Sequence, residues 1–332
     1  MQRAIPSVTQ RGFIALGLVV AMVLGVIGFF YFQFKVPVHP PEEVMLEIAP
    51  GTPSGVIARR LEAAGVIRSA RMFRLMARMR GDAGRLQSGE YRFVKPVTLP
   101  EVMHRLHKGE VVLHRLTVPE GLRNDEVLNL LAEHTATDAA LWREALGTLL
   151  DGKESEGLLL PETYTYRKPV RPKAILLDML NAQRAILQTL QSAWQDENGL
   201  RIVASIVEKE TAVDTERPLV AAVIRNRLEK RMALQMDPTV IYGLWHEDGN
   251  FSGNIRKGDL RRDSPWNTYT RKGLPPTPIC NPGAASLRAA ADPADVEYLY
   301  FVADGSGGHA FASSLEEHNA NVQRWMRFER NR

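Results

Sequence analysis

Cysteine is nearly absent from this chain of 332 residues, and Cys280 is the only one. A single cysteine excludes an intramolecular disulfide and any zinc site built from cysteine thiolates. Cys280 lies in the turn-rich segment PPTPICNPG and has no histidine close to it in sequence. Because a cysteine nucleophile needs an activating partner, we interpret Cys280 as a packing residue.

Motifs for metal and nucleic-acid binding are missing as well. His246 and Glu247 are not followed by a second histidine four residues on, so the two-histidine clamp of helical zinc sites is absent. His309 and His318 could meet in space, but no acid cluster of known metal-site geometry accompanies them. The chain also lacks the basic stripe with interleaved aromatics that is typical of single-strand binding. We therefore expect no metal, no cofactor and no nucleic-acid partner.

Residues 12–32 contain no charge at all. These 21 apolar residues are long enough to cross a hydrocarbon core of about 20 helical residues, and the segment lacks the small-residue exit of a cleaved signal peptide. Arg3 and Arg11 precede it without any acid, whereas Lys35 alone follows closely. The positive-inside rule then predicts a cytoplasmic segment 1–11, a single-pass anchor 12–32 and an exported remainder. We expect the membrane to be the cell inner membrane.

The remainder, of about 300 residues, is large enough for two domains with real cores. The formal net charge of +4 includes three positive charges from residues 1–35, which leaves +1 outside the anchor. The overall charge therefore does not indicate an anionic partner.

A proline-rich linker, 33–43, precedes a region of small strand–turn–helix units, 44–155. Each unit has a short strand, a Gly or Pro turn and an apolar helical pattern. The strands are expected at Met45–Ala49, Gly89–Val94 and His114–Val118, and the helices from Ser54 to Leu61, up to His107, and from Asn124. No cluster of His, Asp or Glu marks a site of its own in this region.

The last region, 156–332, has a different pattern. We expect helices over Pro172–Asp196, over 201–211, from about Pro218 and over Ala284–Ala291, and a hairpin over Tyr298–Phe311. Between them, His246–Gly283 is a long polar segment rich in Asn, Tyr, Trp and Thr. Loops of this length are usually functional or disordered, and these residue types suit a sugar-binding groove.

Glu210 interrupts an apolar helix face in the segment RIVASIVEKET. At roughly 100° per residue, Val203, Ile206 and Val207 share one arc and Glu210 points out through its centre. A carboxyl in apolar surroundings keeps its proton to a higher pH, which suits a general acid at neutral pH. Glu210 is therefore the candidate catalytic residue.

Two features qualify this interpretation. Glu208 and Ser205 fall on the opposite side of the helix, which we expect to be solvated. Glu210 could instead be a structural carboxylate paired with an arginine, since ion pairs also occupy such positions. The arginines near it in sequence are Arg217, Arg225 and Arg227.

Several segments in order, ASIVEKETA, RNRL, LQMDPTVIYG, WNTYTRKGLPP, PICNPG, SLRAA and YLYFVADGSGGHAF, resemble the YceG-like (MltG) family of endolytic murein transglycosylases. The resemblance implies an α+β protein with an N-terminal transmembrane helix, a small LysM-like α+β module and a mixed α+β catalytic domain, 156–332. In that family the catalytic acid is the second Glu of the E-K-E triplet, here Glu210. Cys280 departs from the pattern, where a small residue is expected.

The implied activity is that of a lyase: endolytic cleavage of the β-1,4 bond between N-acetylmuramic acid and N-acetylglucosamine in nascent glycan strands, with a 1,6-anhydro product, which would end strand elongation. One carboxyl can suffice, because the C6 hydroxyl of the sugar replaces the water that glycoside hydrolases need. Peptidoglycan strands are the expected partner, and the resemblance also suggests a peptidoglycan synthase such as a penicillin-binding protein. As groove residues we predict Gln235, Asp237, Thr239, Tyr242, Asn267, Thr268 and Tyr269.

Two alternatives stay open at this point. The chain could be a non-enzymatic, membrane-anchored peptidoglycan-binding or division-scaffold protein in which Glu210 is structural. It could also be a hydrolase that uses water, with Glu210 and Asp237 as its carboxylate pair.

Overall fold

The computed structural model describes residues 8–40, 42–191, 194, 196–249, 251 and 253–330. Residues 1–7 of the expected cytoplasmic segment lie outside this range. The chain divides into two compact units: unit 1, Met1–His114 with Tyr166–Arg171, and unit 2, Arg115–Thr165 with Pro172–Arg332. Contacts thus divide the chain after His114, whereas we expected a boundary between 155 and 156. The functional assignment of 44–155 and 156–332 stays a prediction.

Helix α1 (Val8–Phe34) is the apolar N-terminal helix. Its stretch Ala15–Phe34 has a mean hydropathy of 2.5 over a membrane-length window, none of it buried. Length and composition are therefore compatible with a single-pass anchor, as expected from residues 12–32.

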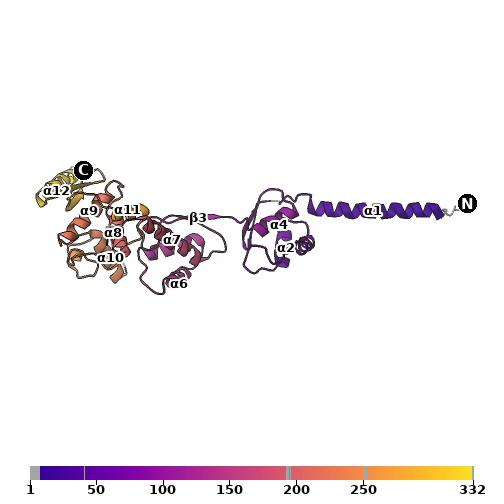
Figure 1. The fold of residues 1–332 in the computed structure, drawn as a ribbon, viewed down its shortest axis with the longest axis horizontal. Helices are drawn as coiled ribbons and strands as arrows, with labels where there is room; N and C mark the ends of the chain where they lie inside the picture. Colours follow the sequence, from indigo (N-terminus) through magenta and orange to yellow (C-terminus); the bar gives the residue numbers. More distant parts are fainter. Residues whose placement is uncertain are drawn as a thin grey trace. The chain divides into compact units, whose positions relative to one another are not determined.

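The rest of unit 1 is a two-stranded sheet covered by helices (Figure 1). Its elements are β1 (Val44–Ile48), α2 (Ser54–Ala63), α3 (Ala70–Met79), β2 (Gly89–Phe93) and α4 (Leu99–Lys108). The two strands are antiparallel, with Val44 opposite Phe93 and Ile48 opposite Gly89. The largest core side chains are Phe73, Tyr91 and Phe93. Helix α3 was not predicted, because its many arginines hide its apolar positions.

The remaining elements belong wholly or mainly to unit 2. They are β3 (His114–Thr117), α5 (Asn124–Thr135), α6 (Ala139–Leu150), β4 (Thr163–Tyr166), α7 (Pro172–Thr189), α8 (Glu197–Glu210), α9 (Arg217–Glu229), α10 (Asp237–Asp248), the short 3-10 helix η1 (Asp259–Arg261), α11 (Ala284–Ala291), β5 (Tyr300–Ala303), β6 (His309–Ala312) and α12 (Leu315–Arg330). The expected hairpin is present, with Tyr300 opposite Ala312. The mixed α+β class is thereby confirmed.

Helix α8 lies at the centre of unit 2, in contact with α9, α10 and α11 (Figure 1). Every residue from Ile202 to Val207 is buried, so the helix has no solvated face along this turn. The prediction for Ser205 was wrong: it is fully buried, and its Oγ accepts a hydrogen bond from Ile279 N at 3.0 Å. Glu208 is partly buried and accepts one from Gly283 N at 2.9 Å.

Candidate active site

Glu210 is the last residue of α8, and a polar network fixes the backbone directly after it. Thr211 Oγ1 donates to Glu216 Oε2 at 2.8 Å. His309 N donates to Glu216 Oε1 at 2.7 Å, and His309 Nδ1 lies 2.7 Å from Oε2. Burial pushes the pKa of Glu216 up, but the hydrogen bonds from His309 and Thr211 outweigh it and the pKa is lowered. A charged Glu216 thus ties the β5–β6 hairpin to the end of α8.

The side chain of Glu210 lines a pocket of about 180 Å³. Arg227, Leu234, Gln235, Met236, Asp237, Tyr269 and Phe301 form the rest of its wall. Oε1 of Glu210 is buried and has no hydrogen-bond partner among the residues that the structure describes. An unpaired buried oxygen costs free energy unless a ligand satisfies it, which marks the pocket as a functional site.

The pKa of Glu210 is raised to about 8. Burial is the main cause, the negative charge of Asp237 adds to it, and the positive charge of Arg227 opposes both. The carboxyl therefore holds its proton at neutral pH and can donate it, as a general acid must.

The arginines that could have neutralised Glu210 form hydrogen bonds elsewhere. Arg217 pairs with Asp214. Arg225 Nη2 donates to Ala294 O at 3.1 Å. Arg227 donates to three backbone carbonyls: Leu299 O at 2.6 Å, Leu234 O at 2.8 Å and Ala233 O at 3.2 Å. The structural alternative for Glu210, a buried ion pair, is therefore not favoured by the geometry.

Three of the seven predicted groove residues share the pocket with Glu210: Gln235, Asp237 and Tyr269. Tyr269 Oη donates to Asp237 Oδ1 at 2.6 Å, which orients that carboxylate. Gln235 has a φ of 52°, a left-handed conformation that is uncommon for a side chain of this type. Such backbone strain concentrates at ligand-binding and catalytic sites.

Three others are buried beneath the pocket wall and hold its backbone. Thr239 Oγ1 lies 2.9 Å from Thr268 Oγ1, and Thr268 Oγ1 accepts from Met236 N at 3.0 Å. Asn267 Nδ2 donates to Arg262 O at 2.7 Å, and its Oδ1 accepts from Tyr269 N at 2.9 Å. Their predicted contact with substrate stays a prediction.

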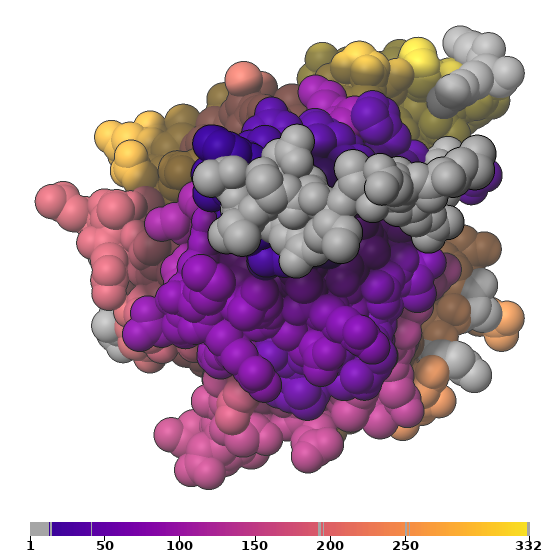
Figure 2. Space-filling view, turned by 90° about the vertical axis from the view of Figure 1, so that its right-hand side faces the viewer, coloured from indigo at the N-terminus to yellow at the C-terminus, as the bar shows by residue number. Residues whose placement is uncertain are grey.

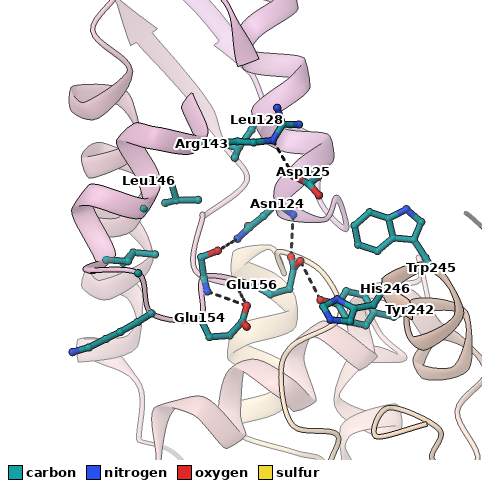
Figure 3. A pocket seen from close by; sticks show the side chains of 15 residues that line it. Asn124, Asp125, Leu128, Arg143, Leu146, Glu154, Glu156, Tyr242, Trp245 and His246 are labelled. Atoms are coloured by element: carbon teal, nitrogen blue, oxygen red, sulfur yellow. Dashed lines mark hydrogen bonds and ion pairs between the residues drawn. The ribbon is translucent and has the colours of Figure 1, made fainter. Parts of the chain in front are cut away.

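The seventh, Tyr242, lines a second pocket of about 330 Å³ together with Asn124, Glu156, Trp245 and His246 (Figure 3). This pocket also contains a carboxyl whose pKa is raised, to about 7, by burial. Both oxygens of Glu156 are occupied, however: Asn124 N donates to Oε1 at 3.0 Å and Tyr242 Oη donates to Oε2 at 3.3 Å. Both carboxyl oxygens of Glu156 thus accept hydrogen bonds, which join α5 to α10, whereas Oε1 of Glu210 is free to interact with a ligand.

Sequence reasoning missed Leu234, Met236 and Phe301 as pocket residues and the raised pKa of Glu156. Leu234 and Met236 are typical core residues, and Phe301 reaches the pocket from a distant hairpin, so none of the three carries a local signal of a pocket. Within the described ranges no group of three or more His, Cys, Asp or Glu side chains could hold a metal ion. The expectation of a cofactor-free site stays a prediction.

Similarity to known proteins is consistent with this site. An endolytic murein transglycosylase of Bacillus subtilis is 29% identical to this chain over 91% of the length of each. The endolytic murein transglycosylase of Streptococcus pneumoniae D39 is 28% identical over 94% of this chain, which covers 65% of that relative.

Among solved structures, a crystal structure of a yceG-like protein of Listeria monocytogenes is similar to this chain with a TM-score of 0.53 and 30% identity. The similarity covers 84% of this chain and 99% of that one. The sequence pattern of the YceG-like family matches residues 46–324. The chain therefore belongs to the YceG-like family.

Proposed function

We propose that this protein is a membrane-anchored lytic transglycosylase, a lyase that cleaves the β-1,4 bond between N-acetylmuramic acid and N-acetylglucosamine inside nascent peptidoglycan strands. The observation that carries the proposal is the partly buried Glu210, which has a pKa raised to about 8 and a buried, unpaired Oε1 at a pocket. The printed names of the curated relatives support the reaction class.

The reaction needs one proton donor that later becomes a base. Protonated Glu210 gives its proton to the bridging oxygen as the glycosidic C1–O bond breaks. The resulting carboxylate then takes the proton of the C6 hydroxyl while that oxygen bonds to C1 and closes the 1,6-anhydro ring. The attack is intramolecular, so holding the sugar in the right orientation replaces much of the entropic cost.

Two neighbours of Glu210 suit the charges that this reaction creates. The guanidinium of Arg227 lowers the pKa of Glu210, so it stabilises the carboxylate left by proton transfer. Asp237 raises that pKa, and its own negative charge can stabilise positive charge at the anomeric carbon. Tyr269 keeps Asp237 oriented through their 2.6 Å hydrogen bond.

The finer parts of the account belong to the same proposal. The strand–helix–helix–strand order of β1, α2, α3 and β2 supports a LysM-like module within 44–155 that orients the enzyme on the wall. The charge pattern around α1 supports an inner-membrane anchor with a cytoplasmic N-terminus and a periplasmic catalytic domain. A peptidoglycan synthase is the expected partner, and release of the nascent strand would end its elongation.

The products distinguish the proposal from both alternatives. The detergent-solubilised full chain is incubated with purified uncrosslinked glycan strands in water labelled with heavy oxygen, and fragments are analysed by mass spectrometry. A lytic transglycosylase gives 1,6-anhydro ends without heavy oxygen. A hydrolase gives reducing ends that carry one heavy oxygen, and a scaffold protein leaves the strands intact.

Replacing Asp237 by Asn is expected to shift the alkaline edge of the pH–rate profile to lower pH. The substitution removes a negative charge that raises the pKa of Glu210, while burial, the larger cause, stays. Glu210 then loses its proton at a lower pH and stops acting as an acid earlier. Initial cleavage rates from about pH 5 to 9 test this, and an unchanged edge would show that Asp237 is not coupled to Glu210.

A further inference from the structure

The net charge of +1 outside the anchor conceals two opposite charges. Residues 44–114 contain twelve Lys and Arg against six Asp and Glu, a net charge of +6. Residues 115–332 contain 27 against 30, a net charge of −3. The small overall charge therefore hides a strongly basic part of the chain next to the anchor.

Helix α3 concentrates this charge. Arg71, Arg74 and Arg78 fall within one arc of about 60° at 100° per residue. All three are exposed, and no acid among the described residues forms an ion pair with any of them. An arc of unpaired arginines attracts a partner rich in anionic groups.

An exposed apolar strip lies beside the arginines on the same helix. Leu75 is 38% exposed and Met79 is 78% exposed, whereas Phe73 and Ala77 point into the core of unit 1. The helix thus has a buried face, a basic arc and an exposed apolar edge. A basic helix with exposed apolar side chains is typical of segments that lie in a lipid–water interface.

The structure ties the start of α3 to the end of the membrane helix. Arg68, two residues before α3, donates from Nη1 to Val36 O at 2.6 Å and from Nη2 to Pro37 O at 2.7 Å. Its guanidinium also lies 4.4 Å from the centre of the Phe32 ring. Figure 2 looks along α1 onto the surface that unit 1, coloured indigo to purple, presents around that helix. A ten-residue helix is about 15 Å long, so no residue of α3 lies far from this junction with the end of α1.

We propose that α3 docks on the membrane surface, with its arginines on the phosphates of anionic phospholipids and with Leu75 and Met79 in the interface. Charge complementarity and the connection to α1 favour lipid over any other anionic partner. Docking would hold unit 1 against the membrane through two attachments, the transmembrane helix and α3. Unit 1 would then not move freely on a flexible stalk. The inference concerns unit 1 alone and stands whether or not Glu210 cleaves glycan.

The test uses the full chain in lipid nanodiscs. Met79→Cys is labelled with an environment-sensitive fluorophore, which the fully buried Cys280 does not take up. Quenching by lipids that carry a nitroxide near the headgroup reports docking. We expect strong quenching in discs that contain phosphatidylglycerol, weak quenching in phosphatidylcholine alone, and a loss of quenching at high salt. Changing Arg71, Arg74 and Arg78 to Gln is expected to lower the docking constant by about a hundredfold.

The matched control changes three exposed arginines of one helix in unit 2, Arg324, Arg327 and Arg330, to Gln, and it should dock as wild type. Equal quenching in the two lipids, or unchanged docking of the α3 triple variant, would overturn the inference. It would also be overturned if the α3 variant lost binding to purified cell-wall sacculi while its quenching by lipid stayed the same. The basic arc would then serve an anionic wall polymer.

Discussion

Glu210→Gln is expected to lower the rate of glycan cleavage by about 10²–10⁴-fold, the usual contribution of a general acid and base. Glutamine has nearly the same shape and fills the same space, but it can neither give nor accept the proton. The measurement is the initial rate of anhydro-product formation by the full chain. A variant that cleaves at the wild-type rate would exclude Glu210 as the acid.

The same substitution is expected to leave the protein as stable as wild type or more stable at neutral pH. The pKa of Glu210 is about 8 in the folded protein, against an ordinary value of 4.5. Between these values the folded state keeps a proton that the unfolded chain releases, so stability falls as pH rises and the loss is complete above about pH 8. At pH 7 the penalty is up to about 3 kcal/mol. Urea unfolding at pH 5 and pH 8 should show this dependence in wild type and less of it in the variant.

Glu156→Gln is the matched control for these measurements. Glu156 is buried and, like Glu210, has a raised pKa, but Asn124 N and Tyr242 Oη occupy its oxygens. Its amide variant should therefore cleave glycan at nearly the wild-type rate. If it lost as much activity as Glu210→Gln, the chemistry would belong to the second pocket.

Arg227→Met is expected to destabilise unit 2 by about 3–5 kcal/mol. The methionine fills most of the volume but leaves the carbonyls of Ala233, Leu234 and Leu299 without their donor. These bonds join the end of α9 to the segment before α10 and to the β5–β6 hairpin, so their loss loosens the pocket wall. Denaturant midpoints of the two proteins give the difference.

Arg225→Met is the comparison for Arg227→Met. Arg225 lies two positions earlier on the same helix and donates to one backbone carbonyl, Ala294 O. We expect Arg225→Met to lower the free energy of unfolding by about 1 kcal/mol. Equal costs for the two variants would show that the Arg227 bonds do not support the pocket. Folded Arg227→Met should also hold the Glu210 proton to a higher pH, since Arg227 lowers that pKa.

The candidate acid could be predicted from sequence because its signal is local. Glu210 stands among Val203, Ile206 and Val207 at helical spacing, and burial of that face follows from the pattern. The same reasoning failed for Ser205, since Ile279 and Cys280, from a segment far along the chain, contact it on the side of the helix that was expected to face solvent. Periodicity shows which face is most apolar, but it does not show how many neighbours a helix has.

The rest of the pocket could not be predicted, since it depends on tertiary contacts. Arg227 was named as a possible ion-pair partner, yet it donates to carbonyls of a nearby segment, at Leu234, and of a distant one, at Leu299. Phe301 comes from a hairpin far along the chain. Gln235, Asp237 and Tyr269 were predicted from the resemblance and the polar composition, and the structure brings them to Glu210.

The central claim is that Glu210 is protonated at neutral pH. Infrared difference spectra between wild type and Glu210→Gln, recorded from about pH 4 to 10, isolate the carbonyl band of this one carboxylic acid. We expect the band to persist through neutral pH and to titrate away near pH 8. A band that is lost near pH 4.5, the ordinary value for a glutamate, would contradict it.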